Sequence, residues 1–145
     1  MTYSALGDVL YQAGRFSDAL INHRAALERL QSTRAHVREV AATIGVAEDL
    51  LALGQAAQAL PILEWGIHHQ VLPDELSLSA RRQFAWARTL WALGKKDPQG
   101  PAVKLARDAR KEYVQLGRQV HRELAALDAW LSGNKISIEA GEGAK

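Results

Sequence analysis

The chain has 145 residues, enough for one domain with a buried core. Hydrophobic residues make up 48% and charged residues 23%, which excludes a chain that is disordered throughout. The lack of cysteine excludes disulfides, Cys-ligated zinc and cysteine nucleophiles, and a net charge of +2 does not by itself indicate nucleic-acid binding. No apolar run is long enough for a membrane span and no signal-peptide pattern opens the chain, so we expect a cytoplasmic protein.

Three helix stops recur at constant spacing. The strings Leu10-Tyr-Gln-Ala-Gly14, Leu50-Leu-Ala-Leu-Gly54 and Leu90-Trp-Ala-Leu-Gly94 share one form, and their glycines lie 40 residues apart. Glycine ends helices because it adopts the left-handed conformation without a Cβ clash. Gly117 predicts a fourth stop. The sequence therefore predicts helices that end at the same phase of a 40-residue repeat.

Apolar periodicity and turn signals predict the helices in chain order. They cover residues 2–13, 16–30, 33–53, 56–71, 74–93, 102–116 and 118–131. We interpret them as three helical hairpins, at about 2–31, 33–71 and 74–116, and a terminal helix at 118–131, all in one domain over 1–131. On the terminal helix, Leu124, Leu127, Trp130 and Leu131 share one side.

Three details qualify this pattern. Pro61 predicts a kink or a late start in its helix. Residues 132–145 contain Gly and Glu and predict a flexible tail. The first helix is short beside the first helices of the other two hairpins, so we expect a piece of a longer array.

The residues resemble a tetratricopeptide repeat array. The first unit carries the matching pattern Tyr3-x2-Leu6-Gly7-x2-Leu10, and each unit has small residues where its two helices are expected to cross. These small residues are Ala19, Ala26, Ala47, Ala59, Ala87, Ala102, Ala106 and Ala109. The chain departs from the family in its 40-residue period, in the missing proline at the end of the first unit and in His23, where an aromatic is usual.

The resemblance implies an all-α, right-handed superhelix whose first helices line a concave face. Transferred to this chain, the partner-binding positions of that face are Asp8, Tyr11, Gln12, Ile44, Glu48, Leu51, Arg81, Phe84, Arg88 and Trp91. Tyr11, Leu51 and Trp91 would form an apolar strip that anchors a peptide. The alternative, that these three are core contacts between neighbouring repeats, stays open, as does a helical bundle with an accidental 40-residue spacing.

Residues 84–94, 102–113 and 127–131 are similar in texture to the C-terminal repeats of large bacterial serine/threonine protein kinases of the myxobacterial type. That resemblance implies a fragment of a larger signalling protein. Any kinase activity would belong to another part of such a protein, because these residues carry no kinase motif.

We expect no catalysis, cofactor or metal site in this chain. His68 and His69 are adjacent, which is unlike a metal pair, His23 has no companion at ligand spacing, and Glu48 and Asp49 are expected to be solvated. The predicted function is protein–protein interaction with a peptide or protein partner.

Two other functions compete with this prediction. One is self-association as a homodimer through apolar surface around Leu6, Val9 and Leu10. The other is binding of an acidic partner or nucleic acid by residues 81–122, which are rich in Lys and Arg. Nucleic acid is disfavoured because the aromatics are not interleaved with those charges as a base-stacking platform requires.

Overall fold

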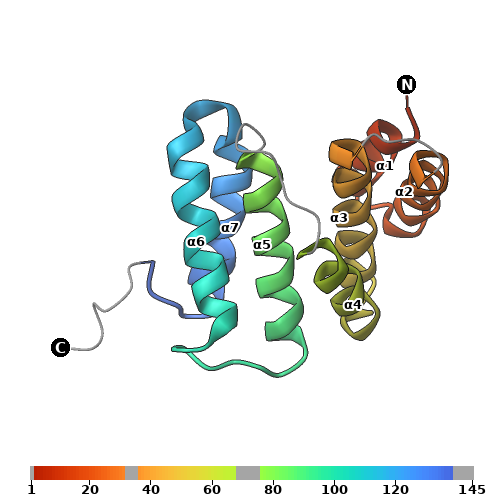
Figure 1. The fold of residues 1–145 in the computed structure, drawn as a ribbon. Helices are drawn as coiled ribbons and strands as arrows, with labels where there is room; N and C mark the ends of the chain where they lie inside the picture. The colour runs from red at the N-terminus through yellow and green to blue at the C-terminus, as the bar shows by residue number, and fades with distance from the viewer. Residues whose placement is uncertain (1, 32–35, 68–75, 139–145) are drawn as a thin grey trace. The chain divides into compact units, whose positions relative to one another are not determined.

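The computed structural model describes residues 2–31, 36–67 and 76–138, and these form helices and turns with no strand (Figure 1). The elements are α1 (Tyr3–Gln12), α2 (Phe16–Gln31), α3 (His36–Ala52), α4 (Ala56–Ile67), α5 (Leu76–Ala92), α6 (Pro101–Leu116), the 3₁₀ helix η1 (Gly117–Val120) and α7 (His121–Gly133). The predicted all-α class is confirmed for this part of the chain. The predicted extensions of helices into 33–35, 68–71 and 74–75 lie outside the described residues.

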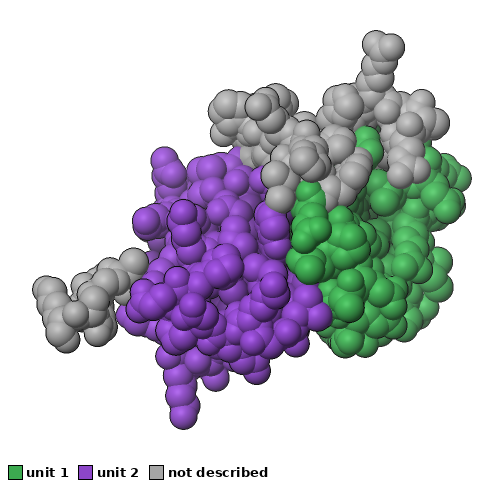
Figure 2. All heavy atoms as spheres, turned by 60° about the horizontal axis from the view of Figure 1, so that its bottom comes forward, with its two compact units in different colours: residues 1–72 green, residues 73–145 purple. Residues whose placement is uncertain are grey.

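The chain divides into two compact units, residues 1–72 and 73–145 (Figure 2). The sequence predicted a single domain over 1–131, and the boundary between the units falls at the predicted junction of the second and third hairpins. In the first unit, consecutive helices from α1 to α4 pack against each other and α1 also contacts α3. In the second unit, α6 packs against both α5 and α7.

The three repeated glycines end their helices in the same geometry. Gly14, Gly54 and Gly94 have φ of 77°, 77° and 89°. Each donates its N–H to the carbonyl three residues earlier, and the following residue donates to the carbonyl five residues earlier. These bonds are Gly14 to Tyr11 (3.0 Å) and Arg15 to Leu10 (2.9 Å), Gly54 to Leu51 (3.1 Å) and Gln55 to Leu50 (2.8 Å), and Gly94 to Trp91 (3.0 Å) and Lys95 to Leu90 (3.0 Å). This is the Schellman arrangement, so the predicted helix stops are confirmed.

Gly117 supplies the predicted fourth stop. It has φ of 78° and ends α6, with its N–H directed at the carbonyls of Tyr113 and Val114. The terminal helix then begins later than predicted, because η1 takes up residues 117–120 before α7 starts at His121. Pro61 lies inside α4, which already begins at Ala56, so the alternative of a late helix start is wrong.

The small residues expected at helix crossings are buried in both units. Each of the eight alanines named for these positions is at most 5% exposed. Side chains of this size let helix axes approach closely, and a larger side chain would separate the pair. The burial of these positions is therefore confirmed, while the superhelix that the repeat implies stays a prediction.

The core of the second unit joins α5, α6, η1 and α7. Phe84, Tyr113, Leu127 and Leu131 are buried in it together with small residues, and Leu124 and Trp130 pack against it. The predicted apolar side of the terminal helix is thus the side that contacts the core. This burial is what holds α7 on the unit.

As far as Ile138, the residues after Leu131, where the sequence predicted a flexible tail, contact the second unit. Asn134 follows α7 and accepts a hydrogen bond from the indole N–H of Trp91 at 3.0 Å. Ile136 packs against the core, and Arg107 donates to the carbonyl of Ser137 at 3.0 and 3.2 Å. Composition gave no sign of these bonds because they reach back 43 and 30 residues. Residues 139–145 lie outside the described part.

Replacing Gly94 with Ala tests the helix stops. We expect a loss of about 1 kcal/mol, because a Cβ at φ of 89° is strained although nothing lies within 4 Å of it. Gly133→Ala is the matched control, since Gly133 also has open space around its Cβ position but no positive φ. Urea unfolding should show a lower midpoint for Gly94→Ala alone. Equal midpoints for the two variants would contradict the assignment.

Candidate functional site

A buried histidine lies at the centre of the first unit. The His23 side chain on α2 is 1% exposed. Its Nδ1 lies 2.6 Å from a carboxylate oxygen of Asp49 on α3, and its Nε2 lies 3.0 Å from a carboxylate oxygen of Asp8 on α1. One side chain therefore bridges three helices. We call Asp8, His23 and Asp49 the imidazole clamp.

Two glycines leave the space that the ring occupies. A Cβ at Gly7 on α1 would come within 2.6 Å of the His23 ring, and a Cβ at Gly45 on α3 within 2.8 Å. Carbon atoms that are not bonded do not approach so closely, so any larger residue would displace the ring or the helix. The two glycines therefore allow α1 and α3 to close on opposite sides of the imidazole.

The clamp holds its histidine in the charged form. Burial alone lowers the pKa of His23, but the hydrogen bonds to Asp49 and Asp8 and the attraction of both carboxylates outweigh it and raise the pKa from 6.5 to about 9. Because the folded-state pKa lies above the unfolded one, the resulting stabilisation is complete below pH 6.5 and is lost as the pH rises through about 9. A shift of this size corresponds to a few kcal/mol.

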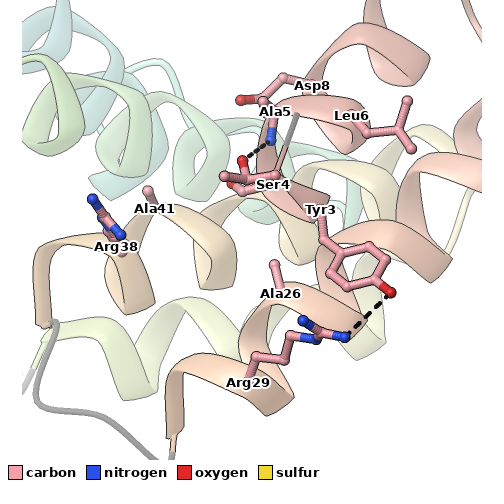
Figure 3. Close-up of a pocket in the computed structure, with 10 residues that line it drawn as sticks. Tyr3, Ser4, Ala5, Leu6, Asp8, Ala26, Arg29, Arg38 and Ala41 are labelled. Carbon is pink, nitrogen blue, oxygen red and sulfur yellow. Dashed lines mark hydrogen bonds between the residues drawn. The ribbon is translucent and has the colours of Figure 1, made fainter.

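A pocket of about 620 Å³ opens beside the clamp in the same unit (Figure 3). Its lining comes from the first turns of α1, the C-terminal half of α2 and the N-terminal half of α3. The lining residues are Thr2, Tyr3, Ser4, Ala5, Leu6, Asp8, Ala26, Arg29, Arg38 and Ala41. The volume is within the range of pockets that bind small ligands or side chains.

The charges around the pocket have both signs. Asp8 belongs to both the clamp and the pocket, and its side chain is 50% exposed. Figure 3 shows Arg29 on α2 turned toward Tyr3, with its guanidinium carbon 4.6 Å from the ring centre, and Arg38 on α3. The pocket lining thus combines alanines with a few charged groups.

The predicted partner-binding residues of the first unit occupy different environments. Asp8 lines the pocket, Gln12 is exposed and Leu51 is half-buried. Tyr11 is half-buried and makes an edge contact with Phe16, their ring centres 5.2 Å apart. The predicted groove positions Ile44 and Glu48 are buried. The pocket therefore contains Asp8 from the predicted set but not the other five residues.

In the second unit, the predicted residues take part in internal packing. Phe84 is buried, with its ring centre 5.8 Å from that of Trp130. The ring centre of Trp91 lies 5.7 Å from that of Trp130. The guanidinium carbon of Arg88 lies 4.3 Å from the ring centre of Phe84. Arg81 is half-buried. These contacts favour the packing interpretation that the sequence left open for Trp91. Phe84, predicted as a partner-binding position, is part of the core.

The basic stretch at 81–122 also supplies internal contacts. Arg110 pairs with Asp128 on α7 at 2.7 Å, and Arg107 holds the Ser137 carbonyl. Lys104 and Lys111 are exposed on α6. Part of the positive charge therefore fastens α7 and the segment after it to α6.

One expectation about charged residues is wrong, and one set of contacts was missed. The partners of His23 were missed because they lie 15 and 26 residues away, outside the short spacings that mark metal pairs. Asp49 is 0% exposed and Glu48 is 9% exposed, so the pair is not solvated. The available signal was the histidine at an aromatic position together with glycines on the preceding and following helices. In 2–31, 36–67 and 76–138, no three His, Asp or Glu side chains are grouped to hold a metal ion.

Replacing His23 with Phe tests the clamp. We expect a loss of about 3–5 kcal/mol at neutral pH, because Asp49 would stay buried without its charged partner. The stability of the variant should also no longer fall between pH 6.5 and 9, when followed by urea unfolding and circular dichroism.

The control for that experiment is His121→Phe, the same chemical change at an exposed histidine. Its effect should stay within about 0.5 kcal/mol. Adding Asp49→Leu to His23→Phe should recover part of the loss, because replacing both partners of a buried pair leaves no uncompensated charge. A variant His23→Phe as stable as the parent would contradict a structural role for the clamp.

No helix in the described part of the chain combines the length and apolar character needed to cross a membrane. No protein-family model, no curated protein and no solved structure matches the chain.

Proposed function

We propose that this chain is a non-catalytic protein–protein interaction module that binds a peptide or protein partner. Stacked two-helix units of the tetratricopeptide type are the architecture we propose for it, and the repeated glycine corners support that choice. The observation that carries the proposed function is the pocket of the first unit, which residues of α1, α2 and α3 line.

The lining of the pocket suits a peptide better than a reaction. Ala26 and Ala41 are small lining residues against which a side chain of the partner can pack. Tyr3 and Leu6 add apolar side chains that are partly exposed. Asp8, Arg29 and Arg38 offer groups of both signs that select among partners. His23, which bonds Asp8 of the pocket lining, is buried and bonded through both nitrogens, so it has no open position for a substrate.

Variants that fill or trim the pocket test this function. Random peptides displayed on phage would be selected on the intact chain, and the affinity of the best peptide measured by fluorescence anisotropy. We expect Ala41→Phe and Arg38→Ala to weaken binding about tenfold or more. Ala41→Phe adds a large side chain to the lining of the pocket, and Arg38→Ala removes a charged side chain from it.

The matched control is Arg24→Ala, an exposed arginine on α2 outside the pocket lining. Its affinity should equal that of the parent. Circular dichroism should confirm that the variants stay folded. Unchanged affinity in both pocket variants, with the fold intact, would remove the pocket as the binding site.

Self-association is the second candidate, because α1 exposes several apolar side chains. Tyr3, Leu6 and Val9 are 41%, 37% and 54% exposed. Apolar side chains grouped on one exposed helix indicate a contact surface more often than single ones do.

Light scattering over a concentration series separates this candidate from the first. If α1 mediates self-association, the mass of the parent should rise with concentration and Val9→Lys should hold it at the monomer. Ile21→Lys is the control, since Ile21 is exposed on α2. A parent chain that stays monomeric at every concentration would rule self-association out.

A further inference from the structure

The two arms of the imidazole clamp differ in exposure. Asp49 is fully buried and lies 2.6 Å from Nδ1, whereas Asp8 is half-exposed and lies 3.0 Å from Nε2. Both partners are carboxylates, which accept hydrogen bonds, so the complete clamp needs a proton on each ring nitrogen. These two carboxylates, one on α1 and one on α3, are the described groups that stabilise the charge of the ring.

A neutral ring can serve only one of the two carboxylates, because it carries one N–H. Leaving the buried Asp49 without its donor costs more free energy than leaving Asp8, which water can solvate. The remaining proton therefore stays on Nδ1. The lone pair of Nε2 then faces a carboxylate oxygen of Asp8 at 3.0 Å, and that contact becomes repulsive.

Helix α1 buries few of its own residues. Within Tyr3–Gln12, all of which the structure describes, Gly7 is the only buried residue. Its contacts from Tyr11 to Phe16 and from Tyr3 to Arg29 involve side chains that are exposed or half-buried. By contrast, α3 is buried continuously from Ala42 to Leu50.

We propose that the imidazole clamp is a latch for α1: when His23 gives its Nε2 proton to solvent, α1 detaches while α2 and α3 remain packed. The pocket has α1 as one wall, so an open latch removes Thr2–Leu6 and Asp8 from its lining. Loss of partner binding on opening rests on the proposed function. The detachment of α1 does not, because it is a property of the unbound chain.

The latch is tested on the free protein by two measurements from pH 7 to above the pKa of about 9 that the clamp gives His23. Nitrogen-15 NMR of the ring should show that the neutral form keeps its proton on Nδ1. Hydrogen exchange, corrected for the intrinsic effect of pH, should show the amides of α1 losing protection on the order of tenfold while those of α3 keep theirs.

Three variants sharpen the test. An asparagine at position 8 can accept from the charged ring and donate to the neutral one, so Asp8→Asn should keep α1 protected across the whole range. Asp8→Ala should show the open level of exchange in α1 already at pH 7. Asp18→Asn, which alters an exposed carboxylate paired with Arg15, should behave like the parent.

Three results would each overturn the latch. These are a neutral ring protonated on Nε2, loss of protection in α1 and α3 together, and release of α1 in Asp8→Asn over the same pH range as in the parent. A latch that opens as expected, with peptide affinity unaffected by Ala41→Phe or Arg38→Ala, would leave the latch standing and remove only the proposed binding function.

Discussion

The first unit depends on one ring that fits between two helices. The imidazole of His23 has room because Gly7 and Gly45 lack side chains, and it is held because each nitrogen meets a carboxylate. Neither the space left by the glycines nor the bonds to the carboxylates would hold the ring alone. Without the glycines, α1 and α3 would be forced apart, and without the carboxylates a polar ring would be buried at a cost that packing does not repay. The distance between α1 and α3, and with it the width of the pocket, follows from this fit.

The same unit shows how a structural contact can also position a surface group. Asp8 is fixed on its inner side by His23 and lines the pocket with the rest of its exposed side chain. A carboxylate on a free rotamer would lose conformational entropy on meeting a partner, whereas this one is already oriented. Asp8 therefore connects the buried charge of His23 to the pocket.

The sequence predicted best the features that local chemistry determines. Glycine at a fixed phase predicted three helix ends and Gly117 a fourth, because the left-handed conformation is a property of a single residue. The alanines that the family resemblance placed at helix crossings are buried. The contacts that were missed join residues distant in the chain: His23 with Asp49, Trp91 with Asn134, and Arg107 with Ser137. Spacing rules describe one helix at a time, so a bridge across three helices leaves no periodic trace.

The contacts that the chain makes with the second unit after α7 affect where this module ends. The helical pattern stops near Leu131, and a boundary chosen from that pattern would discard Asn134, Ile136 and Ser137. The Trp91 indole would then lose its acceptor, the core would lose an aliphatic cover, and the Arg107 guanidinium would lose the carbonyl it holds. A shortened protein made for biophysical work should therefore extend at least through Ile138, the last described residue, so that the second unit keeps the contacts that close it.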